Sequence, residues 1–454
     1  MSDLQHLGLT RAEFTDKGLQ LVRPTLGPTV MILGITDNTS APLEDPYRIE
    51  RGASISDFDL TSGLPSEITK AVQEAQSGGA ENIEVFVVSS DGSTRHSTIS
   101  NADRYTALGR AYTLLRNHPM DLVVPVGAFV DSTGLSAGTS FAYQLANFCY
   151  RGTREYTARF GVIGATPPTA TVAPTGIPTL AEMATWVAAL GAYSTAGVQG
   201  TAFPEYDGTT DADLDNVPDT YALWATSDEA MPTGAPPADA ATVEVDADKN
   251  PIDIGAYMCC YSGWERTRNT AARRLYPTAG YYHTNGAAAF AGLIAATKSH
   301  EAPRNIPLPG MERIRALSPV QADSLAIKRF ITSANKLGQY MVYDAMTSAY
   351  NISDYVRSDF VRITTVRIMH DAVDQVRAAA NPFIRLTNSV TSREALKAAL
   401  DEGLSLLKEK GLEKWDFNLI YTTAMKVLGQ LEIELSLWIE HEIQHITVRV
   451  GLRQ

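Results

Sequence analysis

The residues most suited to covalent chemistry are an aspartate and a serine in two neighbouring glycine-containing segments. The first segment reads Asp131-Ser132-Thr133-Gly134, and the second reads Gly138-Thr139-Ser140-Phe141-Ala142. A serine becomes a nucleophile when a histidine takes its proton and a carboxylate orients that histidine. The serine and the carboxylate are present, so a catalytic site depends on a suitably placed histidine.

Both segments resemble pieces of subtilisin-like serine proteases, the first the aspartate segment and the second the nucleophile segment. That family holds its histidine in a His-Gly context, and none of the eight histidines here precedes a glycine. The family also places the aspartate and the serine on distant elements, whereas here they share one strand-to-helix turn. We expect Ser140 to cap the following helix, and an α/β hydrolase using Ser140 is the alternative hypothesis.

Three aspartates at alternate positions, Asp211, Asp213 and Asp215, resemble the start of a calcium-binding loop. Such a loop requires glycine at its sixth position and glutamate at its twelfth. The chain has Asn216 and Ala222 at those positions. We therefore interpret this segment as a solvated acidic turn.

Two histidines, His441 and His445, have the spacing that places two zinc ligands on one helical face. The residues around them alternate as in a strand, where four residues separate two side chains too far to share a metal. Gly127 follows a strand at the end where α/β folds bind ligands, but no phosphate-binding glycine motif accompanies it. We expect no catalytic residue, no metal, no cofactor and no enzymatic activity.

The net charge of the 454-residue chain is −13, which argues against direct binding of nucleic acid. The most apolar run, 286–297, is shorter than the roughly 20 residues that span a bilayer, so we expect a packed helix and no membrane insertion. The three cysteines lack metal-ligand spacing, which favours buried thiols in a reducing compartment.

Apolar strands alternate with amphipathic helices in the first half of the chain. The pattern predicts strands at 29–34, 83–88, 122–126 and 159–163, and helices at 67–76, 104–116 and 140–151. Gly78 and Gly79 should end the first of these helices. This order predicts an α/β domain with a largely parallel sheet and helices on both faces.

Residues 200–253 interrupt this pattern with Asp, Ala, Thr, Pro and Gly, which indicates a loop-rich insertion. A second unit is expected from residue 318, where Ser318 should cap a helix beginning at Pro319. A strand at 339–346 and a helix at 359–379 should follow.

A capping box of Thr391 and Glu394 is expected to begin a helix over 393–410. The apolar stripe of that helix comprises Leu396, Leu400, Leu404 and Leu407. Apolar residues then alternate along the tail at Leu435, Leu437 and Ile439, and a second β-prone run contains Ile446, Val448 and Val450. The C-terminal unit should therefore be α+β.

Several segments, in order, resemble the contractile tail sheath protein family of bacteriophages and related contractile injection systems. These segments are Ile68-Thr69-Lys70-Ala71-Val72 with Gly78-Gly79, Lys298-Ser299-His300-Glu301-Ala302-Pro303, Ser318-Pro319-Val320-Gln321, and Asn381-Pro382-Phe383. The family's Pro-Gly-Val-Tyr-Val start is missing, and Leu19 to Val22 stands in its place. The resemblance also accounts for the protease-like pieces, because the middle domain of these sheaths is similar in topology to subtilisin without its activity.

The resemblance implies a structural subunit that polymerises around a tail tube and exchanges terminal strands with its neighbours. The expected organisation is an N-terminal arm (1–25), an α/β sheath domain (26–317, with the outward insertion 200–253), a C-terminal tube-facing α+β domain (318–434) and a C-terminal strand arm (435–454). The residues expected in strand exchange are Leu19, Gln20, Leu21, Val22, Leu435, Leu437, Ile439, Ile446, Val448 and Val450. Pairing of either end within its own chain is the alternative.

The family further implies that Lys397, Lys408 and Lys410 face the tube. The implied partners are copies of the same chain, the tail tube protein, and baseplate and tail terminator proteins, in a virion assembled in the host bacterial cytoplasm. Contraction would drive the tube through a cell envelope. Another virion structural protein, such as a tube or baseplate component, is a further alternative.

Overall fold

The computed structural model describes residues 27–49, 55–130, 141–155, 157–166, 179–195, 254–263, 265–313, 317–327, 329–336, 339–349, 359–384, 386–422, 425 and 431–440. The chain divides into two compact units. The first comprises residues up to Thr297 together with Pro303–Ile363, and the second comprises Lys298–Ala302 and the residues from Thr364 onward.

An eight-stranded sheet forms the centre of the first unit, in the order β11-β7-β6-β4-β1-β3-β2, with β5 also paired to β6. All pairs are parallel except β2 with β3, so the prediction of a mainly parallel sheet is confirmed. The strands are β1 (Thr29–Gly34), β2 (Tyr47–Ile49), β3 (Asn82–Val87), β4 (Leu122–Pro125), β5 (Phe129–Val130), β6 (Phe160–Ala165), β7 (Met258–Tyr261) and β11 (Phe330–Ile331).

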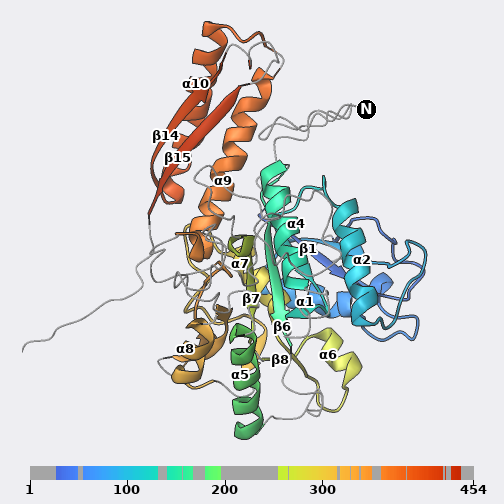
Figure 1. Ribbon diagram of the computed structural model, residues 1–454. Coiled ribbons are helices and arrows are strands. Elements are labelled where there is room, and N and C mark those ends of the chain that lie inside the picture. Colours follow the sequence, from blue (N-terminus) through green and yellow to red (C-terminus); the bar gives the residue numbers. More distant parts are fainter. Residues whose placement is uncertain are drawn as a thin grey trace, which may run out of the picture. The chain divides into compact units, whose positions relative to one another are not determined.

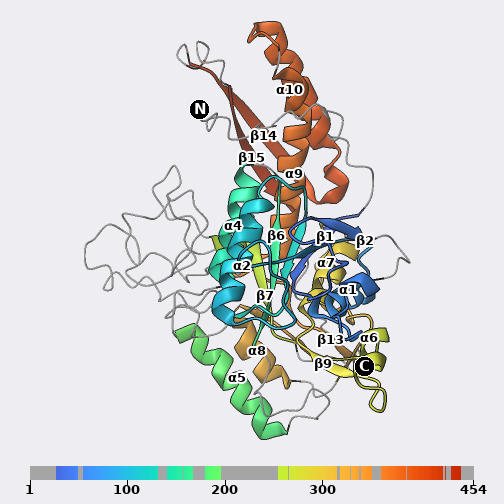
Figure 2. The ribbon, with the colours of Figure 1, turned by 90° about the vertical axis from the view of Figure 1, so that its right-hand side faces the viewer.

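Helices cover both faces of this sheet (Figures 1 and 2). One face carries α1 (Glu67–Gly78) and α7 (Ala287–Ala296), and the other carries α2 (Asn101–Leu114), α4 (Phe141–Glu155) and α5 (Leu180–Thr195). Successive side chains of a strand point to opposite faces, and Val30, Met31, Ile32 and Leu33 of β1 are all fully buried. A sheet covered by helices on both faces requires apolar residues at consecutive strand positions, and β1 has them.

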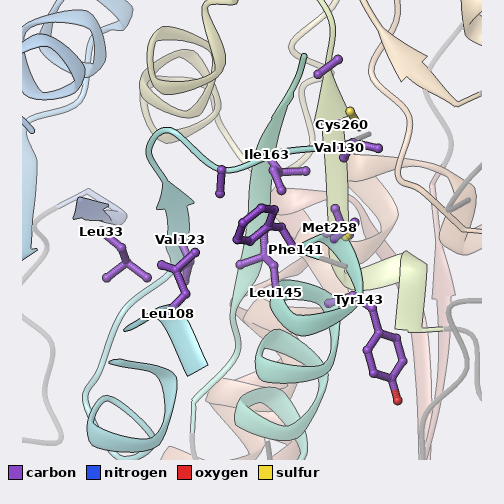
Figure 3. Close-up of a cluster of buried hydrophobic side chains, with 14 of the residues drawn as sticks. Leu33, Leu108, Val123, Val130, Phe141, Tyr143, Leu145, Ile163, Met258 and Cys260 are labelled. Carbon is purple, nitrogen blue, oxygen red and sulfur yellow. The ribbon is translucent and has the colours of Figure 1, made fainter. Parts of the chain in front are cut away.

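The core on the α2–α4 face is built from strand and helix residues in alternation (Figure 3). Leu33, Val123 and Ile163 come from the sheet and meet Leu108 of α2 and Leu145 of α4. All five are at most 3% exposed. Residues that the sequence pattern assigned to strands and amphipathic helices thus share one core.

On the opposite face, α1 and α7 approach each other at two glycines. A Cβ atom on Gly78 would lie 2.1 Å from the carbonyl oxygen of Ala289, and one on Gly292 would lie 2.2 Å from that of Ala75. The alanine-rich run 286–297 is therefore a packed helix, as predicted. Gly79, with φ of +106°, ends α1 in the left-handed conformation.

A three-stranded antiparallel sheet packs beside α1, in the order β10-β8-β9. Its strands are β8 (Glu265–Thr267), β9 (Tyr282–Thr284) and β10 (Met311–Arg313), and α6 (Thr270–Leu275) joins β8 to β9. The remaining elements are η1 (Ser56–Phe58), η3 (Ile254–Tyr257), α8 (Pro319–Ile327), β12 (Ser333–Lys336), β13 (Gln339–Val342) and η4 (Asp359–Val361). Ser318 caps α8 as predicted, accepting a hydrogen bond from the Gln321 backbone N–H at 3.3 Å.

Residues 318–363, which the sequence analysis assigned to the C-terminal domain, lie in the first unit. The physical reason is strand pairing, because β11 extends the main sheet by pairing with β7. Leu325 of α8 also belongs to the core of that sheet.

The second unit contains two helices and a two-stranded antiparallel sheet. Its elements are α9 (Ile363–Ala380), η5 (Asn381–Phe383), α10 (Val390–Ser405), η6 (Lys408–Lys410), β14 (Leu412–Ile420) and β15 (Glu432–Ile439). Leu396, Leu400, Leu404 and Leu407 are buried against Ile368 of α9 and one face of the sheet. The predicted apolar stripe is confirmed.

The start of α10 differs from the prediction. Ser389 is the N-cap, and its hydroxyl oxygen accepts the Ser392 backbone N–H at 3.1 Å. Thr391 lies inside the helix, so the expected capping box with Glu394 does not form. The helix begins at Val390, three residues earlier than predicted, because Ser389 satisfies the first free N–H groups.

Candidate assembly interface

The sheet of the second unit is a hairpin whose two strands pair from Leu412 with Ile439 to Ile420 with Glu432. Along β15, exposed and half-buried residues alternate strictly. The half-buried residues Ile433, Leu435, Leu437 and Ile439 pack on the helices together with Trp415 and Phe417. The hairpin therefore covers the helices with one face only.

The opposite face of the hairpin is polar and exposed. Lys414 lies 4.6 Å from the ring centroid of its cross-strand neighbour Trp438. Asp416 pairs with Ser436 and Asn418 with Glu434. This face has the composition of a solvated sheet surface.

Both outer edges of the hairpin are open within the described residues, where β14 and β15 pair only with each other. An unpaired strand edge exposes a row of backbone N–H and C=O groups that can pair with another strand. Two-stranded sheets are marginally stable by themselves. This hairpin is thus one place in the described chain where a further strand can pair.

Three of the residues expected in strand exchange, Leu435, Leu437 and Ile439, lie in β15 and pair with β14 of the same chain. Their side chains contribute to the core of the second unit. The other expected residues, Leu19 to Val22 and Ile446, Val448 and Val450, lie outside the described residues. A C-terminal arm that begins at 435 would have to take β15 out of this hairpin.

The three lysines expected to face the tube already interact within the second unit. Lys397 on α10 lies 3.2 Å from Glu394, and Lys410 in η6 lies 3.9 Å from Asp371. The Lys408 ammonium lies 5.2 Å from the ring centroid of Trp415. They occupy α10 and the turn after it, so they do not form one compact charged group.

In the first unit, the position where α/β folds bind ligands is filled by a salt bridge. Arg104 of α2 donates two hydrogen bonds of 2.8 Å to Glu67 of α1 and one of 2.8 Å to the Val126 carbonyl oxygen. Gly127 has a φ of +72°, and a Cβ atom at this position would lie 2.7 Å from the Arg104 guanidinium. The end of β4 therefore carries a buried structural contact.

The residues considered for chemistry give no assembled site within the described part of the chain. Asp131 to Ser140, the aspartates at 211–215, and both His441 and His445 lie outside it. Among the described residues, no group of three or more histidine, cysteine or acidic side chains could hold a metal ion. No described helix is long and apolar enough to cross a bilayer.

The three cysteines, Cys149, Cys259 and Cys260, are buried free thiols, as predicted. Burial raises the pKa of the Cys149 thiol to about 12. A thiol with so high a pKa is almost entirely protonated at neutral pH and is a poor nucleophile. These cysteines therefore serve as small core residues.

No protein-family model and no curated protein matches this sequence, but solved structures match the fold. A chain of the PVC sheath complex in contracted state, from an extracellular contractile injection system, aligns with a TM-score of 0.56. The two share 13% sequence identity over 93% of this chain and 91% of that chain. This protein has the fold of a contractile sheath protein.

Two further structures extend the comparison. A chain of the anti-feeding prophage (AFP) baseplate aligns with a TM-score of 0.52 at 14% identity, over 94% of this chain and 93% of that chain. A sheath tail protein from Desulfitobacterium hafniense aligns with a TM-score of 0.47 at 9% identity, over 94% and 96% of the two chains. The alignment with the PVC sheath chain covers 93% of this chain, so the shared fold includes both units.

Two features of this fold were not predicted from the sequence. The strand β14 could have been found, since Trp415, Phe417 and Leu419 alternate with polar residues. The contact between Glu67 and Arg104 carried no signal, because 37 residues separate two ordinary helix-surface charges. Only the parallel order of β1 and β4 brings them together.

Proposed function

We propose that this protein is the structural subunit of a contractile tail sheath that polymerises around a tail tube. The proposal is supported by the sheath fold, which extends over both units. It is also supported by the way the chain uses its interior, since the end of β4 is filled by Arg104 and Glu67. The role is structural and requires no cofactor.

The single observation that carries the proposal is the hairpin of β14 and β15 with its two open edges. An open edge accepts a strand from a second molecule by main-chain hydrogen bonds, in the manner of β-augmentation. We assign one edge to residues 19–22 of a neighbouring copy and the other to the β-prone run 446–450 of another. Each copy then joins its neighbours through one completed sheet.

The energetics favour a continuous mesh over any single contact. A strand of four or five residues, the length of either proposed arm, forms about four backbone hydrogen bonds when it pairs with β15, each contributing about 1 kcal/mol net. One such contact is weak, but every subunit takes part in several. A polymer of this kind can let its subunits move during contraction without losing the connections between them.

The further features of the proposed function follow the same resemblance. The first unit has a subtilisin-like topology without its activity, residues 200–253 face outward, and the second unit faces the tube. The partners are other copies of this chain, a tube protein, and baseplate and terminator proteins. Assembly takes place in the host cytoplasm, and contraction drives the tube through a cell envelope.

Negative-stain microscopy of the purified protein tests the proposal. The intact chain should form hollow striated cylinders, whereas variants lacking residues 1–23 or 441–454 should stay dispersed. Thermal unfolding of each truncated variant is the control, because both units should still melt cooperatively. Ordered cylinders formed by the variant without residues 1–23 would contradict the assignment of that arm.

A further inference from the structure

The negative charge of this chain is concentrated in one segment. Residues 200–253, here called the acidic segment, contain 13 Asp and Glu residues and one basic residue, Lys249. Its net charge is therefore −12, out of −13 for the whole chain. The other 400 residues are almost neutral, so a basic surface on them stands out electrostatically.

Such a surface lies on the three-stranded sheet and α6. Arg266 and Arg268 of β8 and the residue after it both donate to one oxygen of Glu312, at 2.7 and 3.0 Å. Arg273 on α6 is exposed and forms no ion pair within the described residues. These three residues, the arginine cluster, carry three positive charges against the single carboxylate of Glu312.

Arg266 and Arg268 both lie against the aromatic ring of Tyr281. The guanidinium carbons of Arg266 and Arg268 lie 4.8 and 5.2 Å from the ring centroid of Tyr281. Stacking on one aromatic ring holds both groups in place and lowers the entropy that binding would otherwise cost. Arg274 on the same helix differs, because it is already paired with the buried carboxylate of Asp59 at 2.6 Å.

The arginine cluster and the described residues that flank the acidic segment lie on opposite faces of the main sheet. The segment is preceded by α5 and followed by Ile254, and Leu190 of α5 and Ile254 are both part of the core on the α2–α4 face. The cluster lies on the α1 face, where the Ala271 backbone N–H donates to Gln73 of α1 at 2.8 Å. The flanks of the segment thus lie away from the cluster of the same chain, and in a polymer a neighbouring copy can supply the segment instead.

We propose that the arginine cluster binds the acidic segment of a neighbouring copy. This inference rests on the proposed polymer, which supplies that second copy. Carboxylates pair with arginine in a planar, two-donor geometry, and the acidic segment offers many such groups in a short length. The contact would join the bodies of two subunits independently of strand exchange at the hairpin.

Fluorescence anisotropy with a labelled peptide tests this proposal on the full-length, dispersed protein. The peptide comprises residues 205–219, which contain six acidic side chains. It should bind at low salt and dissociate as salt is added. A matched peptide with all six acids replaced by Asn or Gln should not bind.

Arginine variants locate the site. Arg273→Gln should weaken peptide binding about three- to five-fold, the effect of losing one exposed ion pair. Arg110→Gln removes an equally exposed arginine of α2, on the opposite face, and should leave binding unchanged. Charge reversal provides a second test. A peptide in which Asp211, Asp213 and Asp215 are replaced by Lys should bind the Arg273→Glu protein more tightly than the natural peptide binds that same protein.

Absence of binding at low salt, or equal losses in the Arg273 and Arg110 variants, would overturn the proposal. The assay uses dispersed protein, so its result is separable from sheath formation. Cylinders without peptide binding would reject this contact alone, and binding without cylinders would support it while rejecting the proposed sheath function.

Discussion

The two units of this protein build β-structure in opposite ways. Every strand residue of β6 is buried, and the sheet around it is covered by helices on both faces. In β15, by contrast, no residue is fully buried, and both edges of its sheet are open within the described residues. The main sheet of the first unit is covered on both faces, whereas the hairpin of the second unit is covered on one face and unpaired at both edges within the described residues.

This difference assigns the two units different tasks. A body whose strands are buried on both faces has little backbone left to offer a partner. A hairpin with one solvent-exposed face and two unpaired strand edges can bind further strands without any rearrangement of its core. Under the proposed function, the main sheet stabilises the chain and the hairpin takes part in assembly, and the following measurements test this comparison.

The largest effect is expected from removing a core side chain of the first unit. Phe290→Ala removes a fully buried ring of α7 and should lower the free energy of unfolding by about 3–5 kcal/mol. Leu437→Ala removes a half-buried side chain of β15 and should cost about 1–2 kcal/mol. Hydrogen exchange followed by mass spectrometry separates the two units, and equal losses would remove the contrast between them.

Breaking the ion pair between α1 and α2 should have a smaller effect. Arg104→Ala leaves Glu67, whose side chain is 30% exposed, without its partner and should cost about 3 kcal/mol. Arg110→Ala, on the same helix, breaks only a surface pair with Glu44 and should cost at most about 1 kcal/mol. Urea denaturation of both variants measures the difference.

The first unit should lose stability as the pH rises toward neutrality. Burial raises the pKa of Glu74 to about 7 from 4.5, while its carboxyl accepts a hydrogen bond from Tyr282 at 2.7 Å. The folded state therefore holds this proton more tightly than the unfolded state, and the stabilisation is complete below pH 4.5. Up to about 3 kcal/mol should disappear as the pH rises from 4.5 to about 7, with no further loss from this group above that.

Glu74→Gln should abolish this pH dependence, because the amide does not ionise. Urea midpoints measured between pH 5 and pH 8.5 provide the comparison. A variant that still loses stability between pH 5 and pH 7 would show that another group carries the effect.

The second unit should respond to pH in the opposite direction. Burial, with Arg377 and Arg367 nearby, lowers the pKa of His370 to about 3 from 6.5. The unfolded state therefore takes up the proton first, and stability is lost as the pH falls below 6.5, by about 1 kcal/mol per pH unit. His370→Gln should remove this acid sensitivity, as read from hydrogen exchange in α9, and an unchanged slope would contradict it.

The smallest expected effect tests the start of α10. Ser389→Ala removes the capping hydroxyl and should cost about 1 kcal/mol. Thr391→Ala, within the helix, should be neutral or slightly stabilising. If Thr391→Ala were the more damaging of the two, the cap would lie where the sequence first suggested.

Strands of the first unit were predictable because their burial on both faces leaves continuous apolar runs such as 122–126. Helix ends were harder, since Ser389, Thr391 and Ser392 can all cap a helix and only backbone geometry selects Ser389. The tail strand was predicted from alternation at Leu435 and Leu437, but alternation does not identify the partner strand. The pairing with β14 depends on a turn, and the pairing of the arms depends on a second molecule.

The crossing of α1 and α7 sets a limit on which sequences this fold accepts. At Gly78 and Gly292 the missing side chain is replaced by the carbonyl of the other helix, at 2.1 and 2.2 Å from where a Cβ would stand. Even alanine would force the helices apart and open the layer beneath the sheet. In a saturation mutagenesis library selected for folded protein, only glycine should be recovered at these two positions. The solvent-exposed positions of the same helices should accept many residue types.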